Sequence, residues 1–361
     1  MLKFAVLGSG NGGRAFCAQI AAKGYPVTMW EPLDEAPDFS RIAERKEMFL
    51  EGDMTLGGPI GATKDIADAM KGAAVLLVVV PSFAHEPIFK KMIPLLEDGQ
   101  HILIVPGNFA AYRLKAMMDK FGCTKKVTIS CTETMPYACR IKSFDVVNIF
   151  KKKFTVHIAT SPSSANDEVL GIFNDVFDGY VHFEKFDHLL MIDMSNVNFT
   201  LHPLPVLLNY GDIEKHPKTF RHYMDGITPL ISEQMHRMDA ERVEAGKAVG
   251  FTLTPTLEML KTYYGMNETK TIYEYVNSPE TPYADLVGHN VRGRYLTEDV
   301  PGVVAPVSRI AEKAGFRTPL SSLVVDLASQ LHGTDYWTCG TTLESLGIGD
   351  KSIDEILDMM R

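Results

Sequence analysis

Two short segments of the chain carry the residue types that proton transfer requires. His202 lies in the otherwise apolar segment Asn196–Pro205, four residues after Asn198, so the two side chains would share one helix face. Pro203 and Pro205 lack a backbone N–H, so a helix should start, stop or kink there. An imidazole titrates near neutrality and suits a general acid or base. The pattern fits an active site and a hydrogen-bonded core histidine equally well.

The second segment, Arg292–Pro301, holds two arginines and two carboxylates. An arginine such as Arg294 can bind a substrate carboxylate through two N–H groups. A buried aspartate such as Asp299 can orient an imidazole and stabilise its protonated form. Surface salt bridges are the alternative interpretation. Other histidines lie in polar or amphipathic surroundings and are expected to face solvent: His188, His216, His222 and His236.

A glycine-rich loop near the N-terminus is the sharpest motif in the sequence. It follows an apolar strand, opens a helix and contains the G-x-G-x-x-G pattern, a combination that is typical of dinucleotide binding. The helix N-terminus would offer N–H groups and a partial positive charge to phosphate. The residues of this loop are Gly8, Ser9, Gly10, Asn11, Gly12 and Gly13.

The end of the next strand indicates which dinucleotide is bound. Glu31 follows Gly8 by 23 residues, and an acidic residue at about this spacing accepts hydrogen bonds from the ribose 2′-hydroxyl and repels a 2′-phosphate. This favours NAD. Arg41 and Arg45 on the following helix could reach a 2′-phosphate, so NADP is not excluded.

Further candidates follow the ends of other predicted strands, where open α/β sheets bind their ligands. Pro81 ends a central strand and is expected to line the cofactor cleft. The polar segment Thr132–Arg140, which includes Thr134 and Cys139, should face the same cleft. No motif places a base beside Cys139, so we interpret it as a lining residue.

The elements that must position these residues alternate strand and helix in the first half of the chain. This alternation predicts an α/β fold with an N-terminal Rossmann-type doubly wound parallel sheet. The expected strands are Lys3–Leu7, Pro26–Glu31, Val75–Val80, His101–Val105 and Lys126–Cys131, and a hairpin is expected from Val146–Phe150 and Phe154–Ala159. The expected helices are Gly12–Lys23, Phe39–Leu50, Lys64–Met70, Phe83–Leu96, Phe109–Phe121 and Ser164–Phe177. Strand-like runs become rare after about residue 185, and amphipathic helices such as Thr228–Val249 replace them. We therefore expect a dinucleotide-binding domain over residues 1–185 and a mainly helical domain over residues 186–361.

Composition limits the possible partners of the chain. Its 361 residues are 45% hydrophobic and carry a formal net charge of -9, which argues against nucleic-acid or anionic-membrane binding. The five cysteines show no metal-ligand or disulfide spacing, so no metal is expected. No signal peptide or membrane span is recognisable. A cytoplasmic protein that binds small molecules is therefore expected, and its amphipathic helices leave a homodimer open.

The ordered set of motifs resembles the opine dehydrogenase family over nearly the whole chain. The features that carry the resemblance are the glycine loop, Asn198-x-x-x-His202-Pro203, Gly226-Ile-Thr-Pro229, Asp239-Ala-Glu-Arg242, Arg294-Tyr295-x-x-Glu298-Asp299 and Thr342-Leu343-Glu344. Members of this family use a nicotinamide cofactor to reduce the imine formed between an α-keto acid, often pyruvate, and an amino acid.

The resemblance implies a role for each candidate. It makes His202 the general acid/base, Asp299 its partner and Arg294 the clamp for a substrate carboxylate. Thr134 and Cys139 fall where relatives line the amino-acid pocket, and Asn198 is counted with the substrate-binding residues. Some relatives carry a different residue at the position of Arg140, so no role is transferred to it.

Two other functions stay open at this point. A hydroxy-acid or glycerol-3-phosphate-type dehydrogenase would share the two-domain build, although it typically carries a catalytic lysine that Asn198–His202 lacks. A non-catalytic NAD-binding sensor would need the glycine loop but not the set of histidine, aspartate and arginine.

Overall fold

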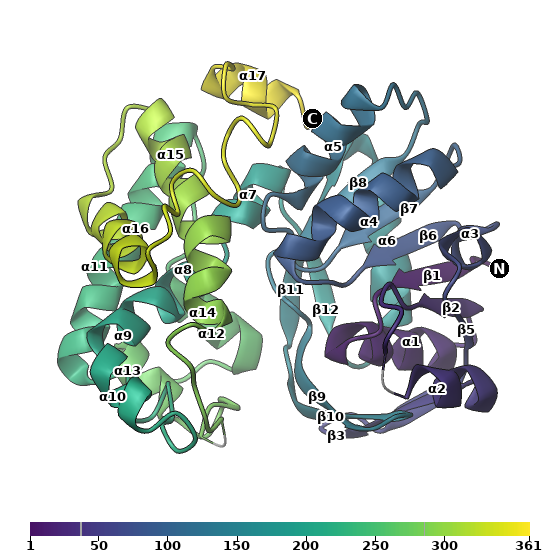
Figure 1. Cartoon of the computed structure of the whole chain (residues 1–361), viewed down its shortest axis with the longest axis horizontal. Helices are drawn as coiled ribbons and strands as arrows, with labels where there is room; N and C mark the ends of the chain where they lie inside the picture. Colours follow the sequence, from purple (N-terminus) through teal and green to yellow (C-terminus); the bar gives the residue numbers. More distant parts are fainter. Residues whose placement is uncertain (37, 285) are drawn as a thin grey trace. The chain divides into compact units, whose positions relative to one another are not determined.

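The computed structural model describes residues 1–36, 38–284 and 286–361. Contacts between Cα atoms divide the chain into two compact units, one of residues 1–192 with 360–361 and the other of residues 193–359 (Figure 1). We call these units the nucleotide unit and the helical unit and describe each by itself.

An eight-stranded sheet forms the centre of the nucleotide unit, in the order β12-β11-β8-β7-β6-β1-β2-β5. Its neighbouring strands are parallel except for β8 and β11, which pair antiparallel. The strands are β1 Phe4–Leu7, β2 Val27–Trp30, β5 Gly61–Thr63, β6 Val75–Val78, β7 His101–Ile104, β8 Thr128–Thr132, β11 Thr155–Ser161 and β12 His182–Lys185. All residues of β1 and β6 are buried, because helices cover both faces of the sheet. The predicted Rossmann-type α/β class is confirmed.

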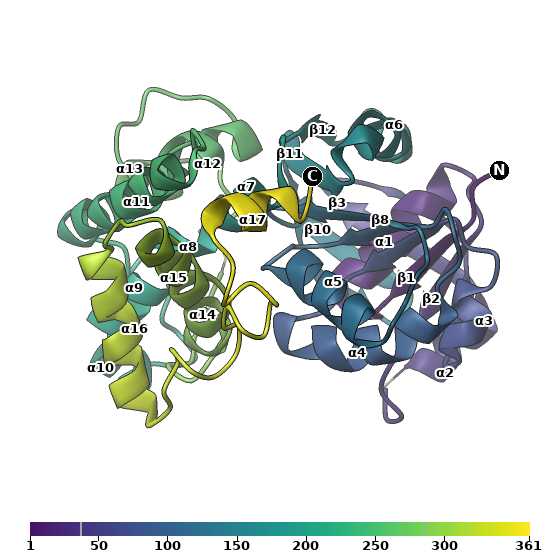
Figure 2. The ribbon, with the colours of Figure 1, turned by 90° about the horizontal axis from the view of Figure 1, so that it is seen from above.

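Helices connect these strands at the expected places. α4 and α5 pack against each other over one face of the sheet, and α6 lies on the opposite side (Figure 2). The helices are α1 Asn11–Ala22, α2 Phe39–Arg45, α3 Ile66–Met70, α4 His85–Met92, α5 Ala110–Lys120 and α6 Asn166–Val176. Three short 3-10 turns accompany them: η1 Ser82–Ala84, η2 Ile93–Leu95 and η3 Ser163–Ala165.

A second, four-stranded sheet in this unit corrects two predictions. Its order is β4-β3-β10-β9, and it packs against α1. The strands are β3 Glu47–Gly52, β4 Leu56–Pro59, β9 Tyr137–Ser143 and β10 Val146–Lys152. The helix expected over Phe39–Leu50 ends at Arg45, because Lys46 takes a left-handed conformation with φ 56 and the next residues form a strand.

The expected hairpin from Val146–Phe150 and Phe154–Ala159 does not form. β10 pairs with β9 and β3, whereas β11 pairs with β8 and β12 of the larger sheet. Lys151 and Lys152 therefore end β10, and Lys153 and Phe154 connect the smaller sheet to the larger one. The antiparallel partner of β10 is β9, whose alternation of polar and apolar residues was not interpreted as a strand.

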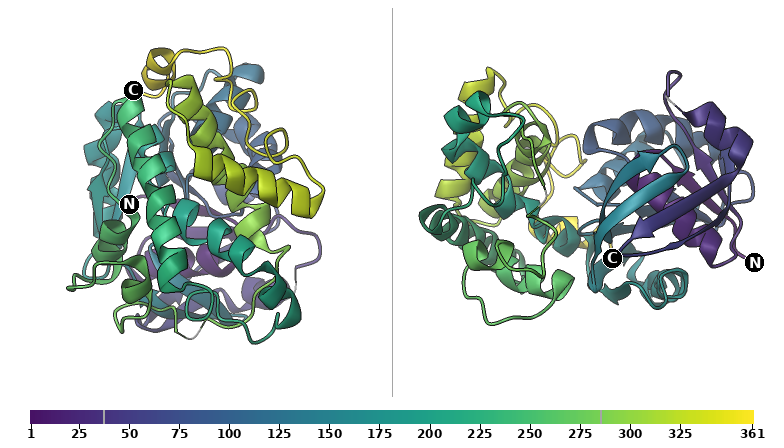
Figure 3. Two further views of the ribbon diagram at one scale, coloured as in Figure 1. Left: turned by 90° about the vertical axis from the view of Figure 1, so that its left-hand side faces the viewer. Right: turned by 90° about the horizontal axis from the view of Figure 1, so that it is seen from below.

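The helical unit is built around the long helix α11, which contacts α8, α13, α15 and α16. The left-hand view of Figure 3 looks onto these helices. Its helices are α8 Asn198–Leu201, α9 Pro203–Leu208, α10 Tyr210–Lys215, α11 Pro229–Val249, α12 Thr256–Tyr264, α13 Ile272–Val276, α14 Arg294–Thr297, α15 Ala305–Lys313, α16 Pro319–His332 and α17 Ile353–Asp358. α7 Leu189–Met194 spans the division between the units, and η4 Val300–Val304 is a π-helix. In the described parts of the chain, no helix has the length and apolar character needed to cross a bilayer.

A buried ion pair joins α11 to its neighbours. Asp239 accepts hydrogen bonds from Arg242 Nε at 2.9 Å, from the Thr256 hydroxyl at 2.6 Å and from the Thr256 backbone N–H at 2.7 Å. Arg242 is fully buried and also donates to the Met194 and Thr254 carbonyls. Burial opposes ionisation of Asp239, but the charge of Arg242 and the bonds from Thr256 hold the pKa of Asp239 below its ordinary value. Every charged group in this cluster therefore has a partner.

Replacing Arg242 should strongly destabilise the protein, because it would leave the Asp239 carboxylate buried without its counter-ion. For Arg242→Met we expect a loss of about 3–5 kcal/mol in the free energy of unfolding, measured by chemical denaturation. Arg237→Met is the control on the same helix, because Arg237 pairs with Glu233 at the surface. Its effect should stay within about 0.5 kcal/mol. Equal losses in the two variants would contradict the role given to the buried pair.

Candidate active site

The glycine loop between β1 and α1 has the shape of a phosphate cradle. Gly8 has φ +125, and a Cβ added there would lie 2.5 Å from the Val79 carbonyl oxygen. A Cβ on Gly13 would lie 1.9 Å from the Gly8 oxygen. Gly10 is the N-cap of α1, and a Cβ there would meet no atom within 4 Å. The first N–H groups of α1 therefore begin beside open space, which fits the pyrophosphate of a dinucleotide.

The polar side chains of the loop tie it to its surroundings. The Ser9 hydroxyl donates to Glu31 Oε2, and Glu31 Oε1 accepts from the Leu33 N–H at 2.7 Å. Glu31 is buried at the end of β2, next to the loop. Asn11 Oδ1 accepts from the Ile141 N–H at 2.7 Å and thereby anchors the start of α1 to β9. Glu31, the carboxylate predicted to bind the ribose, is therefore held beside the loop by two hydrogen bonds. The Asn11 side-chain oxygen is used to attach α1 to β9.

The two arginines that could reach a 2′-phosphate both have acidic partners. Arg41 pairs with Asp38 at 2.9 Å and stacks on the Phe144 ring, and Arg45 pairs with Glu47 at 2.9 Å. These ion pairs lower the positive charge that a 2′-phosphate would meet.

Segments that follow the parallel strands meet beside the loop. Pro81 follows β6 and precedes η1, whose Ser82 hydroxyl accepts from Asn108 Nδ2 at 3.0 Å in the segment after β7. A Cβ on Gly12 would lie 2.6 Å from Met135 Cε, so the turn after β8 packs directly against the loop. Residues that follow β6, β7 and β8 therefore lie together at the carboxyl edge of the sheet.

Two charged side chains without a role predicted from the sequence lie at the turn after β8: Glu133 within the turn and Lys153, which follows β10. Lys153 Nζ donates to the Thr134 hydroxyl at 2.9 Å and to the Met135 carbonyl at 2.7 Å. Both carboxylate oxygens of Glu133 accept from the His157 backbone N–H, at 3.0 and 2.8 Å. Burial raises the pKa of Cys139 to about 12, so its side chain is a thiol and not a nucleophilic thiolate. The sequence signal for Lys153 was masked by the two adjacent lysines.

His202 and Asp299 meet in the helical unit, although 97 positions separate them. His202 Nδ1 lies 2.8 Å from Asp299 Oδ2, and Asn198 Nδ2 donates to Asp299 Oδ1 at 3.4 Å. His202 stands at the predicted break, between α8 and the Pro203 that begins α9. Asp299 stands directly before η4, and π-helical turns often occur at functional sites.

Aromatic rings enclose the imidazole. Tyr295 stacks on His202 with ring centroids 3.5 Å apart and 8° between planes, and the Tyr223 hydroxyl lies 3.0 Å from His202 Nε2. His222 Nε2 bonds the Leu201 carbonyl, and its ring packs edge-on to His202. Tyr223 and Tyr295 have no role predicted from the sequence, and His222, expected to face solvent, is buried.

Two of the four histidines expected to face solvent are buried. His222 is 4% exposed and His188 is 6% exposed. His188 Nδ1 accepts from the Leu190 N–H, and His222 belongs to the aromatic cluster. Polar residues next to them in the sequence face solvent, whereas the two imidazoles are buried. The polarity of neighbouring residues therefore does not show which way a histidine side chain points.

Burial disfavours the charged form of both partners in the pair. It lowers the pKa of His202 to about 3, helped by the positive charge of Arg294. It also raises the pKa of Asp299 well above its ordinary value, and the Glu298 charge adds to this effect. Burial therefore favours a pair with no net charge, in which one proton lies between Nδ1 and Oδ2 and a second lies on Nε2.

Arg294 is placed to bind an anion near this pair. Its Nε donates to Glu298 Oε2, while 68% of the Arg294 side chain is exposed. A guanidinium has further N–H donors on its two terminal nitrogens, so the exposed end is available to a carboxylate. The adjacent Tyr295 on α14 connects Arg294 to His202.

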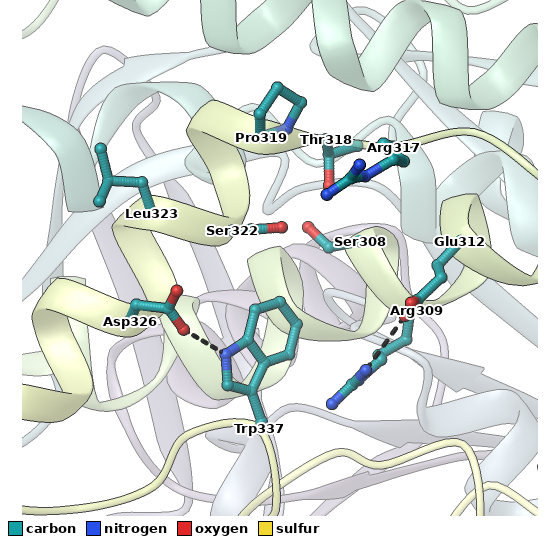
Figure 4. A pocket seen from close by; sticks show the side chains of 10 residues that line it. All are labelled: Ser308, Arg309, Glu312, Arg317, Thr318, Pro319, Ser322, Leu323, Asp326 and Trp337. Carbon is teal, nitrogen blue, oxygen red and sulfur yellow. Dashed lines mark hydrogen bonds and ion pairs between the residues drawn. The ribbon is translucent and has the colours of Figure 1, made fainter.

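One surface pocket of the helical unit contains none of the expected site residues (Figure 4). It lies along α15 and α16, where Trp337 Nε1 donates to Asp326 Oδ1 at 2.7 Å and Arg309 pairs with Glu312 at 3.1 Å. In the residues that the structure describes, no cluster of three or more histidine, cysteine or acidic side chains could hold a metal ion.

Comparison with known families matches the two parts of the chain separately. Residues 3–119 match the N-terminal domain of NAD-dependent glycerol-3-phosphate dehydrogenase. Residues 185–332 match the α-helical domain of NAD/NADP octopine/nopaline dehydrogenase. The match to the glycerol-3-phosphate enzymes thus concerns the nucleotide-binding part, whereas the helical part matches the octopine/nopaline enzymes.

Relatives align over nearly the whole chain. The opine dehydrogenase of Arthrobacter sp. (strain 1C) is 34% identical over 349 residues, which cover 96% of this chain and 95% of that protein. Solved structures of octopine dehydrogenase with NADH and L-arginine and with NADH and pyruvate align with TM-scores of 0.81 and 0.77, each at 22% identity. Each alignment covers 99% of this chain and 98% of the other. The chain belongs to the opine dehydrogenase family of NAD(P)-dependent oxidoreductases.

Proposed function

We propose that this protein condenses an α-keto acid such as pyruvate with an amino acid and reduces the resulting imine at the expense of NADH. The balanced reaction joins keto acid, amino acid, NADH and one proton to give an N-(carboxyalkyl) amino acid, NAD⁺ and water. The observation that carries the proposal is the buried contact between His202 and Asp299, which can supply that proton. The Arthrobacter relative and the ligands in the octopine dehydrogenase structures support the same reaction.

The binding residues divide between the two units. In the nucleotide unit, the glycine loop would hold the pyrophosphate and Glu31 the ribose 2′-hydroxyl, so that the bound cofactor supplies the hydride. Thr134 and Cys139 would line the place of the amino acid. In the helical unit, Arg294 would hold a substrate carboxylate. Asn198 contacts Asp299, so its proposed role is to position the catalytic pair.

The proton chemistry follows from the two protons of the neutral pair, one on Nε2 and one shared between Nδ1 and Oδ2. His202 would donate the proton on Nε2 to the substrate, while the proton shared with Asp299 stays on Nδ1. The histidine then ends uncharged and the carboxylate ends ionised. Because this leaves one net negative charge in a buried site, the nearby Arg294 guanidinium stabilises the product state. The reverse oxidation would return the proton to the same nitrogen.

The direct test is oxidation of NADH in the presence of pyruvate, with and without a panel of amino acids. The proposal expects oxidation that depends on the added amino acid. Equal rates without any amino acid would favour a hydroxy-acid dehydrogenase. Tight NADH binding without turnover across the panel would favour a sensor.

Removing the proton donor should abolish turnover while sparing the cofactor site. For His202→Gln and for Asp299→Asn we expect kcat to fall by about 10²–10⁴-fold, because neither variant keeps a protonated imidazole oriented towards substrate. NADH affinity, measured by fluorescence titration, should stay within twofold of the wild-type value, roughly the noise of such a titration. His216→Gln alters an exposed histidine of the same unit and is the matched control. A His202→Gln variant that kept its wild-type rate would refute the assignment.

Glu31 should set the choice of cofactor. Glu31→Gln keeps an acceptor for the Leu33 N–H but removes the negative charge. We expect the KM for NADH to rise about tenfold and the preference for NADH over NADPH to shrink accordingly. Glu35→Gln, a change in the loop beyond β2, serves as the control. An unchanged ratio of kcat/KM for the two cofactors would show that Glu31 does not contact the ribose.

A further inference from the structure

A buried lysine at the edge of the larger sheet has no part in the reaction outlined above. Lys153 follows β10 and is only 7% exposed. Its ammonium donates to the Thr134 hydroxyl at 2.9 Å and to the Met135 carbonyl at 2.7 Å. Lysine is almost never buried to this extent without a specific partner, so the contact with this turn is a defined feature of the site.

The position of this turn gives the lysine a possible ligand. Thr134 and Met135 follow β8, at the edge where β6, β7 and β8 end, and Met135 packs against Gly12 of the phosphate loop. The Lys153 ammonium is therefore hydrogen-bonded to the half-buried Thr134 hydroxyl, which lies beside the cofactor loop. Ligands of open α/β sheets bind at this edge.

The hydrogen bond also fixes what Thr134 can offer to a ligand. Because its oxygen accepts from the Lys153 ammonium, the hydroxyl proton must point to another acceptor. A hydroxyl that accepts a charge-assisted bond becomes a stronger donor. A group at this position therefore meets a proton donor backed by a positive charge, which suits carboxylate, carbonyl or amide oxygens and repels a cation.

The nearby acidic group, Glu133, acts on the charge of Lys153 and also bonds β11. Glu133 uses both carboxylate oxygens for the His157 backbone N–H, and its Oε1 lies 3.1 Å from His157 Nδ1. It faces β11 through these bonds, whereas Lys153 bonds the turn. Cys139 stays a neutral thiol. Among these groups, Lys153 is the one that bonds the Thr134 hydroxyl.

We propose that Lys153 determines amino-acid specificity by selecting substrates with neutral or acidic side chains and rejecting those with cationic side chains. This inference rests on the proposed function and on the placement of the amino acid beside Thr134. Lys153 acts through Thr134 and is therefore a positioning and specificity residue and not a catalytic one.

Pairs of substrates that differ in side-chain charge but little in shape give the sharpest test. For the wild-type protein we expect kcat/KM for citrulline to exceed that for arginine at least about tenfold, because like charges at close range are costly. Glutamate should be used at least as well as glutamine. In Lys153→Met the preference for citrulline should shrink to about twofold or less, which corresponds to a residual difference below about 0.5 kcal/mol, while Lys153→Arg should retain most of it.

The neighbouring lysine offers a matched control. Lys152 pairs with Asp53 at 3.4 Å and has no bond to the turn. Lys152→Met should leave the ratio of citrulline to arginine unchanged. A similar loss of discrimination in this variant would assign the effect to overall charge and overturn the role of Lys153.

The pH dependence of the citrulline-to-arginine ratio of kcat/KM tests whether the charge of Lys153 causes the discrimination. Burial lowers the pKa of Lys153 to about 8, against the opposing effects of Glu133 and Cys139. The ammonium is charged below this pH and loses its charge above it, so discrimination against arginine should fade between pH 7 and pH 9.5, a window of roughly one unit or more on each side. Arginine stays charged throughout that window. The other charged groups nearby are Arg140 on β9 and His157 and Glu184 on β11 and β12.

The variant Lys153→Arg separates Lys153 from these neighbours, because it leaves them in place and keeps its own charge at high pH. In this variant the ratio of kcat/KM for citrulline to that for arginine should be constant with pH. A ratio that still fell at high pH would assign the titration to His157 and overturn the inference. Equal use of arginine and citrulline by the wild-type protein would overturn the inference while leaving the proposed function intact. Absence of turnover with every amino acid would overturn both. The wild-type measurements need no variant and stand even if Lys153→Met does not fold.

Discussion

The buried hydrogen bond between His202 and Asp299 is the interaction on which the candidate site of the helical unit depends. Neither group is readily charged in its buried position, and the pair is stable there because each provides the hydrogen-bond partner of the other. The break at Pro203 and the π-helix after Asp299 bring the two side chains to one place. Tyr295 and Tyr223 then fix the plane and the outer nitrogen of the imidazole. A proton donor with one orientation is the result.

The two units differ in the groups that would bind anionic ligands. The nucleotide unit would offer a helix N-terminus and a glycine loop to phosphate, and the helical unit would offer the exposed guanidinium of Arg294 to a carboxylate. The ligands of the proposed reaction are mostly anionic, yet the chain has a net charge of -9. Binding must therefore come from a few placed donors and not from the overall field. Arg41 and Arg45 illustrate the point, since their acidic partners offset their charge.

Local sequence patterns predicted the parts of the site that depend on the backbone. Gly8 and Gly13 were identified because strand, loop and helix follow one another directly. The structure shows that a side chain at Gly8 would collide with the Val79 backbone and one at Gly13 with the Gly8 backbone. His202 was identified because Pro203 interrupts an apolar helix. Both patterns concern residues close together in the sequence, where steric rules apply directly.

Contacts between distant segments could not be predicted in the same way. Tyr223 and Lys153 reach their partners through tertiary packing, and nothing in their neighbouring residues marks them. The smaller sheet was missed for a related reason. Its strands β3 and β10 lie far apart in the sequence, and their pairing and their packing against α1 are both long-range contacts. The pairing of Asp299 with His202 came from resemblance to a family and not from either segment alone.

The identity of the bond that receives the hydride tests the central claim most directly. The protein would be incubated with pyruvate, NADH deuterated at the transferred position and an amino acid labelled with ¹⁵N at its amino group. Mass spectrometry should find one product that carries both labels, with deuterium on the former carbonyl carbon of pyruvate and ¹⁵N bonded to it. Deuterated lactate together with unchanged amino acid would contradict the account, because the hydride would then have reduced a carbonyl and not an imine.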